Sequence, residues 1–266
     1  MKNKWISFFR YNQYSDGIKF PLMYHVRWIV KRLPKIRFDI PCNIISPSGT
    51  KHCLSSDPLD ERVTADMLGI LANVYFPPSI DSMLKNFDGW ILDVGAFNGS
   101  WAVELLNRFP ELKAVLIEPN HKKIKNINKN LELNKCFYRA RILELGLGKE
   151  NGRGWLVEST DGSWGNWVEE DSLSQPDGSQ EVSTITLDKA LNGVKPVIVK
   201  CNAEGAEFEL IHQLITLGLR PKLIILMVHS EFGDLDALWN ALVNNHYSVK
   251  VVRDYAPRPI WHAYSS

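Results

Sequence analysis

The chain has 266 residues, of which 45% are hydrophobic and 23% charged, so it can bury one large core. Its formal net charge of +1 argues against a nucleic-acid-binding protein, and no apolar run approaches the roughly 18 residues of a membrane-spanning helix. Four cysteines without metal-site spacing, and an N-terminus without a secretory pattern, favour a cytoplasmic protein with reduced thiols.

Residues 1–55 are predicted to form a basic, aromatic extension, and residues 56–266 to form one α/β domain. In the extension, lysine and arginine far outnumber Asp16 and Asp39. Residues 24–33 fit a short amphipathic helix, which could contact an anionic membrane surface or a protein partner. The alternative is that the apolar residues of the extension pack on the core while its cations stay in water.

Residues 57–87 carry apolar side chains at three- and four-residue spacing, which predicts helices. Pro77 and Pro78 interrupt this pattern. We expect Ser79 or Asp81 to cap the short helix that follows, because their side-chain oxygens can accept hydrogen bonds from its first backbone N–H groups.

Residues 91–109 read as a strand, a ligand-binding loop and the first helix of a nucleotide-binding α/β domain, with the helix N-terminus facing the ligand. Gly95 and Gly99 allow a sharp turn and close helix packing. Phe97 replaces the middle glycine of a dinucleotide loop, G-x-G-x-x-G. The loop therefore suits a ligand without phosphate, whose cationic amino group Asp93 can hold directly or through water.

A second marker follows the next predicted strand, at residues 114–117. Glu118 ends this strand, and its carboxylate can accept two hydrogen bonds from the vicinal hydroxyls of a ribose. Asn120 is expected to cap the helix over residues 120–133. Together the two markers favour S-adenosylmethionine as the cofactor over a nicotinamide, and a nicotinamide-dependent oxidoreductase is the alternative that Phe97 disfavours.

The rest of the chain alternates between further strands and helices. The predicted strands are at 139–145, 197–200 and 223–228, with a terminal hairpin at 247–252 and 259–264, and the helices are at 205–217 and 234–243. Residues 158–180 are polar and are predicted to form a long loop or hairpin. Trp164 and Trp167 in this stretch either stack on a sugar or anchor the loop to the core.

Four segments, in this order, resemble the signatures of the FkbM-type methyltransferases. They are Asp-Val-Gly-Ala at residues 93–96, Glu-Pro at 118–119, residues 182–188, and residues 199–207. The resemblance covers roughly residues 57–231 and implies a class I Rossmann-like fold with a seven-stranded, mostly parallel sheet and a C-terminal β-hairpin. It implies methyl transfer from S-adenosyl-L-methionine to a hydroxyl of a sugar, glycan or glycosylated natural product, with transfer to nitrogen left open.

The resemblance also places the cofactor on particular residues. The residues expected to bind it are Asp93, Gly95, Ala96, Asn98, Gly99, Glu118, Pro119, Leu145 and Gly146. Adenine is expected near the backbone of Leu145 and Gly146, with Glu144 as the alternative contact, because side chains alternate between the faces of a strand.

The predicted catalytic residues are Asn202, Glu204 and His229. The family usually has Asp where this chain has Asn202, and an amide can orient a hydroxyl but cannot accept its proton. His229 is the first choice as base, since its ordinary pKa of about 6.5 suits proton removal near neutrality. Glu204 or water is the alternative base, and Glu204 could instead bind the amino group of the cofactor or cap the helix at residue 205.

The acceptor is expected to contact Trp164, Trp167, Lys200 and Glu231. We predict no metal, although oxygen ligands such as Asn202 and Glu204 would leave little spacing signature. The competing hypothesis is a catalytically degenerate binding or scaffold protein, suggested by Asn202 and the basic extension. The oligomeric state stays open.

Overall fold

The computed structural model describes residues 43–46, 48–53, 75–157, 166–168, 179–253 and 258–266. The amphipathic helix predicted at residues 24–33, the helical pattern over residues 57–74 and Trp164 lie outside the described residues. Among the described residues, no helix is long and apolar enough to cross a membrane.

A seven-stranded sheet forms the centre of the molecule, with the strand order β12-β13-β11-β10-β3-β4-β5. Its strands are β3 (Trp90–Val94), β4 (Lys113–Ile117), β5 (Ala140–Leu143), β10 (Pro196–Cys201), β11 (Leu223–Met227), β12 (Tyr247–Arg253) and β13 (Ile260–Ser265). The five neighbouring strands β11, β10, β3, β4 and β5 are parallel. Strand β13 runs antiparallel to β11 and pairs with β12 as a hairpin. This confirms the predicted seven-stranded, mostly parallel sheet with a C-terminal hairpin.

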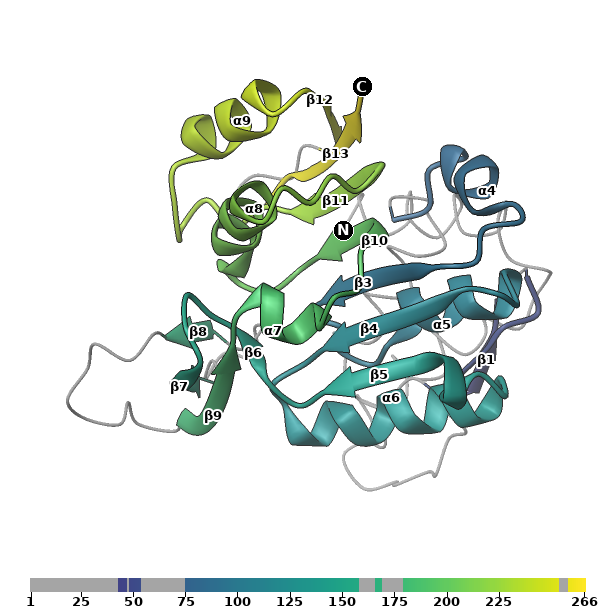
Figure 1. The fold of residues 1–266 in the computed structure, drawn as a ribbon. Coiled ribbons are helices and arrows are strands. Elements are labelled where there is room, and N and C mark those ends of the chain that lie inside the picture. Colours follow the sequence, from purple (N-terminus) through teal and green to yellow (C-terminus); the bar gives the residue numbers. More distant parts are fainter. Residues whose placement is uncertain (1–42, 47, 54–74, 158–165, 169–178, 254–257) are drawn as a thin grey trace, which may run out of the picture.

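Helices cover both faces of this sheet (Figure 1). One layer contains α4 (Ser79–Leu84), α5 (Ser100–Arg108) and α6 (His121–Leu133), and the other contains α7 (Leu187–Leu191), α8 (Ala206–Thr216) and α9 (Leu235–Asn244). Alternate residues of the parallel strands supply the two cores: Ile91 packs with the first layer and Leu92 with the second. The strands are therefore apolar on both faces, as parallel strands between helices must be.

The ends of the helices show which predicted caps form. The Asn120 side chain accepts a hydrogen bond from the Lys122 backbone N–H at 2.9 Å, so the predicted cap of α6 is confirmed. The predicted cap of α4 is wrong. That helix begins at Ser79, with Pro78 at the N-cap, which leaves Ser79 and Asp81 inside the helix and without a capping hydrogen bond.

A second sheet, which the sequence did not predict, has the order β6-β9-β7-β8. Its strands are β6 (Gly146–Leu147), β7 (Gly152–Val157), β8 (Asn166–Val168) and β9 (Ser179–Ile185). It lies beyond the carboxyl ends of β3, β4 and β5 (Figure 1). The polar stretch predicted as a long loop or hairpin therefore contains β8 and the start of β9, which both pair with β7.

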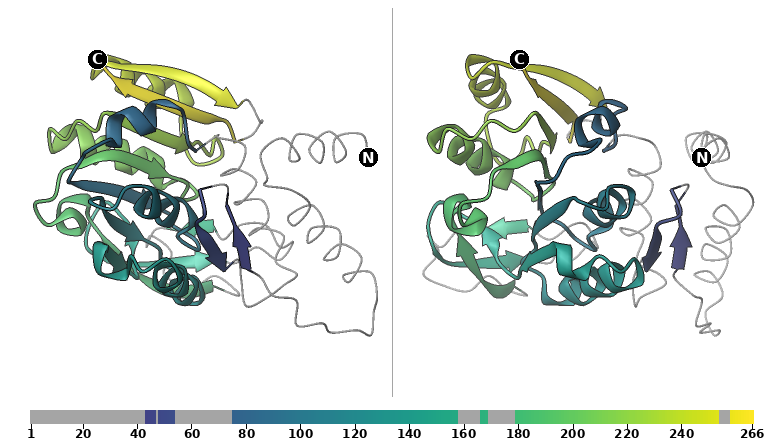
Figure 2. Two further views of the ribbon diagram at one scale, coloured as in Figure 1. Left: turned by 90° about the vertical axis from the view of Figure 1, so that its right-hand side faces the viewer. Right: turned by 45° about the vertical axis from the view of Figure 1, so that its right-hand side comes forward.

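A short antiparallel hairpin, β1 (Asn43–Ile45) and β2 (Lys51–Cys53), belongs to the predicted extension. Figure 2 shows it, in purple, outside the helical layer of the central sheet. Strand β2 contacts α6. At least this part of residues 1–55 thus packs against the α/β domain.

Candidate active site

The loop between β3 and α5 is shaped by two glycines with left-handed backbones. Gly95 has a φ of 67°, and a Cβ atom there would overlap the backbone oxygen of Asn202 at the end of β10. Gly99 has a φ of 72°, and a Cβ atom there would lie 3.3 Å from the Ile127 side chain on α6. Both positions therefore combine the backbone conformation that glycine favours with close packing.

Asp93, at the end of β3, forms a buried ion pair with Lys200 of β10. The Lys200 Nζ atom lies 2.9 Å from Asp93 Oδ1 and also donates to the Gly95 backbone oxygen at 2.9 Å. Burial raises the pKa of the Asp93 carboxyl, which the charge of Lys200 opposes. The ammonium group of Lys200 is thus directed at the loop, and its predicted contact with the acceptor has no support in this geometry.

Only one oxygen of Asp93 remains for a ligand. Among the described residues, Asp93 Oδ2 is buried and has no hydrogen-bond partner by geometry, although the Ala102 backbone N–H in the first turn of α5 is near enough to lower the pKa of the carboxyl. The expectation that Asp93 holds a cationic amino group therefore applies to Oδ2 alone, because Oδ1 already has a cation beside it.

Glu118, at the end of β4, faces the same loop. Its carboxylate accepts hydrogen bonds from the backbone N–H of Phe97 at 2.7 Å and of Asn120 at 2.9 Å. Burial raises its pKa to about 7, against the lowering effect of those hydrogen bonds. A carboxylate offers about four acceptor sites, so two remain for other donors such as hydroxyl groups.

The backbone N–H groups at the start of the loop are engaged within the protein. Gly95 and Ala96 both donate to the Ile117 backbone oxygen, at 3.0 and 3.1 Å. Asn98 is buried, and its side-chain oxygen accepts from the Ser100 backbone N–H and hydroxyl at 3.2 and 2.6 Å. The Asn98 side-chain oxygen therefore holds the start of α5, whereas its Nδ2 atom is buried without a hydrogen-bond partner among the described residues, so the predicted cofactor contact applies to Nδ2 alone.

The residues after β5 separate the two candidates for the adenine contact. Glu144 is exposed and its carboxylate lies 2.8 Å from the His121 ring, so its side chain is already paired at the surface. Leu145 is half-buried, and Gly146 is buried and pairs with Thr184 in the second sheet. The geometry thus favours the backbone at Leu145 and Gly146 over Glu144. Pro119 is half-buried directly beside Glu118.

His229 follows β11 and is fully buried between two glutamates. Its Nδ1 atom lies 3.0 Å from Glu207 Oε1, and its Nε2 atom lies 3.6 Å from Glu204 Oε1. Burial alone would lower the pKa of His229, but the interactions with Glu204 and Glu207 outweigh it and raise the pKa to about 9. The imidazole is therefore protonated near neutral pH, and the argument for a base with an ordinary pKa does not apply.

Glu207 has the capping role that the sequence offered as one alternative for Glu204. Its carboxylate accepts from the backbone N–H of Gly205, the N-cap of α8, at 3.0 Å and from that of His229 at 2.6 Å. The signal for this residue was the second glutamate of Glu-Gly-Ala-Glu at residues 204–207. Glu204 is thereby left to contact other groups.

Arg258, which the sequence analysis missed, connects the ends of β10 and β11. One of its guanidinium nitrogens, Nη2, lies 2.8 Å from Glu231 Oε1 and 3.2 Å from Glu204 Oε2. Burial would raise the pKa of Glu231, but hydrogen bonds and the Arg258 charge lower it overall. No local motif marks Arg258, which stands just before the last strand.

Most of the predicted site residues, together with Arg258, thus fall into two neighbouring groups. The loop after β3, Asp93, Lys200 and Glu118 form the first, and Glu204, His229, Glu231 and Arg258 form the second. Asn202 joins them, since it is half-buried and its backbone N–H donates to the Val94 oxygen at 3.0 Å. Trp167 belongs to β8 opposite Leu156, in the second sheet.

The strand order, the glycine loop after β3 and the carboxylate at the end of β4 define the fold as that of a class I methyltransferase. Residues 93–249, more than half of the chain, match the family model described as the methyltransferase FkbM domain. The chain belongs to this family, as its motifs predicted. No curated protein matches the sequence of this chain.

Solved structures share the fold at low sequence identity. The methyltransferase FkbM from Methylobacillus flagellatus KT has a TM-score of 0.50 at 14% identity, over 73% of this chain and 47% of that protein. The chain thus spans less than half the length of that relative. A putative O-methyltransferase from Klebsiella pneumoniae has a TM-score of 0.45 at 9% identity, over 73% of this chain and 80% of that one. A precorrin-6y C5,15-methyltransferase from Geobacter metallireducens GS-15 has a TM-score of 0.43 at 17% identity, over 71% of this chain and 87% of that one.

Proposed function

We propose that the protein is an S-adenosylmethionine-dependent O-methyltransferase that acts on a hydroxyl of a sugar, glycan or glycosylated natural product. Membership of the FkbM methyltransferase family supports methyl transfer. The observation that carries the choice of cofactor is the buried carboxylate of Glu118 at the end of β4, which holds the Phe97 backbone N–H and retains acceptor sites.

The residues around the loop fit S-adenosylmethionine. Glu118 would accept hydrogen bonds from the ribose hydroxyls, and Asp93 Oδ2, buried and without a partner among the described residues, would face the amino group. The backbone at Leu145 and Gly146 would border the adenine. When bound, the cofactor supplies a methyl group on a positively charged sulfur, so the task of the protein is mainly to align donor and acceptor.

Loss of the acceptor proton is assigned to Glu204. Its side chain is 12% exposed and lies between protonated His229 and Arg258, whereas the His229 side chain is fully buried. A positioned base contributes about 10²- to 10⁴-fold to such a reaction. His229 and Arg258 would orient the carboxylate, and the Asn202 amide would orient the acceptor hydroxyl.

The polar groups at the ends of β10 and β11 support a hydroxylated acceptor. Arg258 and Glu231 have side chains that are 26% and 37% exposed, so both can still hydrogen-bond to a ligand. Sites for sugars combine a few placed polar groups with aromatic surface. The predicted stacking of Trp164 and Trp167 on the acceptor would supply that surface and remains a prediction.

Calorimetric titration with S-adenosylhomocysteine tests the cofactor assignment. We expect micromolar binding that is lost in Glu118→Ala and absent for NADH. Because hydroxyl donors favour the ionised carboxylate and burial raises the Glu118 pKa to about 7, binding should tighten as the pH rises through about 7. A folded wild-type protein that fails to bind at millimolar concentration would overturn the assignment.

A catalytically degenerate scaffold protein is the second candidate, favoured by Asn202 in place of the family's usual Asp. Such a protein could still bind S-adenosylhomocysteine. Turnover separates the two: methyl transfer to any member of a panel of sugars and glycosylated acceptors supports the enzyme, and cofactor binding without turnover across the panel supports the scaffold.

A further inference from the structure

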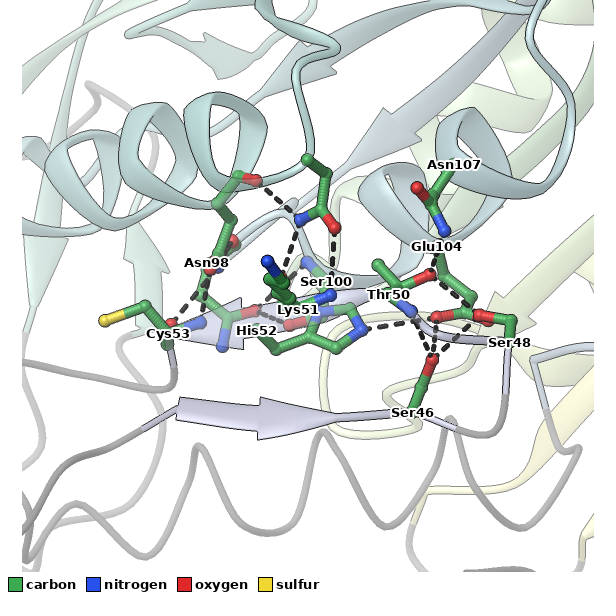
Figure 3. Close-up of polar contacts among 12 residues, drawn as sticks. Ser46, Ser48, Thr50, Lys51, His52, Cys53, Asn98, Ser100, Glu104 and Asn107 are labelled. Carbon is green, nitrogen blue, oxygen red and sulfur yellow. Dashed lines mark hydrogen bonds and ion pairs between the residues drawn. The ribbon is translucent and has the colours of Figure 1, made fainter. Parts of the chain in front are cut away.

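The predicted extension reaches the loop after β3 through one buried side chain, that of Asn130 on α6. The Asn130 amide donates to the backbone oxygen of Asn98 in the loop at 2.8 Å. It also accepts from the backbone N–H of Cys53 in β2 and donates to the Cys53 oxygen at 3.2 Å. Figure 3 shows Cys53 and Asn98 at this contact. Both hydrogens of the amide are thus used, one on the hairpin and one on the loop.

Asn134, the C-cap residue of α6 and four positions after Asn130, makes the same kind of contact with β2 but does not contact the loop. Its amide accepts from the Lys51 backbone N–H at 2.9 Å and donates to the Lys51 oxygen at 2.6 Å. Four helical residues rise about 6.0 Å and two strand residues about 6.8 Å, so the two amides match alternate residues of β2. Its remaining hydrogen bond, at 2.8 Å, goes to the backbone oxygen of Asn130. Asn134 therefore holds the hairpin only.

Two adjacent residues of the loop after β3, Phe97 and Asn98, are hydrogen-bonded to two different elements of the fold. Glu118 accepts from the Phe97 backbone N–H at 2.7 Å, and Asn130 donates to the Asn98 oxygen at 2.8 Å. Phe97 has a φ of 56°, a left-handed conformation that is unfavourable for a bulky residue and persists only where the surroundings impose it. Asn98 then leads directly into α5 through its hydrogen bonds to Ser100.

We propose that Asn130 is a positioning residue that couples the β1–β2 hairpin to the loop after β3, and so sets the affinity for S-adenosyl ligands. This inference rests on the proposed function. Removal of the Asn130 amide leaves the buried oxygen of Asn98 without this donor. The loop then relaxes from the conformation in which the Phe97 N–H meets Glu118, the carboxylate assigned to the ribose.

Paired variants of the full chain test the coupling. By calorimetry, Asn130→Ala should weaken the affinity for S-adenosylhomocysteine about tenfold, while Asn134→Ala should change it by less than about twofold. In hydrogen exchange, the amides of residues 95–101 should exchange faster in Asn130→Ala only. Asn130→Asp keeps an acceptor for the Cys53 N–H but lacks the donor to Asn98, so it should bind as weakly as Asn130→Ala and serves if the alanine variant does not fold.

Equal affinities of the Asn130 and Asn134 variants, with unchanged exchange of the loop, would overturn the proposal. Both variants lose contacts to the hairpin, so a purely structural role would lower their melting temperatures without separating their affinities. If the wild-type protein does not bind S-adenosylhomocysteine, the proposed function fails, and the exchange of residues 95–101 alone decides whether Asn130 holds the loop.

Discussion

Gly95, in the loop after β3, packs against the backbone of Asn202 after β10. The effect of this close packing on stability can be separated from the effect of the left-handed backbone of Gly95. Gly218 has a similar φ, 64° against 67°, but a Cβ atom at Gly218 would meet nothing within 4 Å. We expect Gly95→Ala to lower the free energy of unfolding by about 3 kcal/mol or more, since it adds an overlap with Asn202 to the backbone strain. Gly218→Ala should cost only about 1–2 kcal/mol. Urea unfolding of both variants measures the difference, and equal losses would contradict the contact.

The protonation state of His229 distinguishes the two candidate bases. The neighbouring glutamates outweigh burial and raise its pKa to about 9, so the ring carries a proton at neutral pH. If Glu204 accepts the acceptor proton, the wild-type kcat at saturating cofactor stays level from neutral pH to about pH 9. In that case Glu204→Gln lowers kcat by roughly 10²- to 10⁴-fold.

A pH–rate profile measures this prediction, with Glu209→Gln on α8 as a control for loss of a carboxylate from the same region. A rate that climbs about tenfold per pH unit up to about pH 9 would instead identify neutral His229 as the base.

At the scale of elements, the β1–β2 hairpin is attached to α5 by a buried polar cluster around Glu104 (Figure 3). Glu104 Oε2 accepts from the Ser46 hydroxyl at 2.8 Å and lies 3.2 Å from the His52 ring. Burial would raise the pKa of Glu104, but hydrogen bonds from His52, Ser48 and Ser46 lower it to about 2. The ionised carboxylate therefore stabilises the folded protein.

This attachment should fail in acid. Because the folded pKa of Glu104 lies below its ordinary value of 4.5, its contribution is present above pH 4.5 and is lost as the pH falls towards about 2. We expect this contribution to be roughly 3 kcal/mol. Melting temperatures of the wild type and Glu104→Gln across this range provide the measurement. Glu144→Gln, which changes an exposed carboxylate, is the control, and parallel curves for the wild type and Glu104→Gln would contradict the assignment.

At the scale of the whole molecule, most of the parallel strands could be predicted because they are apolar runs that end at polar residues, and their assembly into one seven-stranded sheet was implied by the family resemblance. The strand predicted at residues 223–228 is found at Leu223–Met227, and the terminal hairpin deviates by about one residue. The second sheet could not be predicted in this way. Strands β6, β8, β1 and β2 have two or three residues, too few to show an alternating pattern.

Site residues could be predicted from the sequence where they directly follow an apolar strand. They could not be predicted where their role depends on pairing with a residue far away in the sequence. Asp93 and Glu118 were found from their positions after apolar runs. The ion pair of Asp93 with Lys200 joins residues 107 positions apart and depends on β10 lying beside β3. Asn130 and Asn134 could not be identified from the sequence, because nothing local shows that the edge of β2 covers them.

The attachment of β2 to α6 also has a consequence for how the chain assembles. Its hydrogen bonds to Asn130 and Asn134 span 77 and 83 residues, so closing these long loops costs chain entropy before any contact is gained. The hairpin is synthesised before α6. The backbone groups of β2 that bond to Asn130 and Asn134 therefore stay hydrated until that helix has formed. The hairpin is the first described segment to be synthesised, yet its contacts with α6 can form only after that helix is in place.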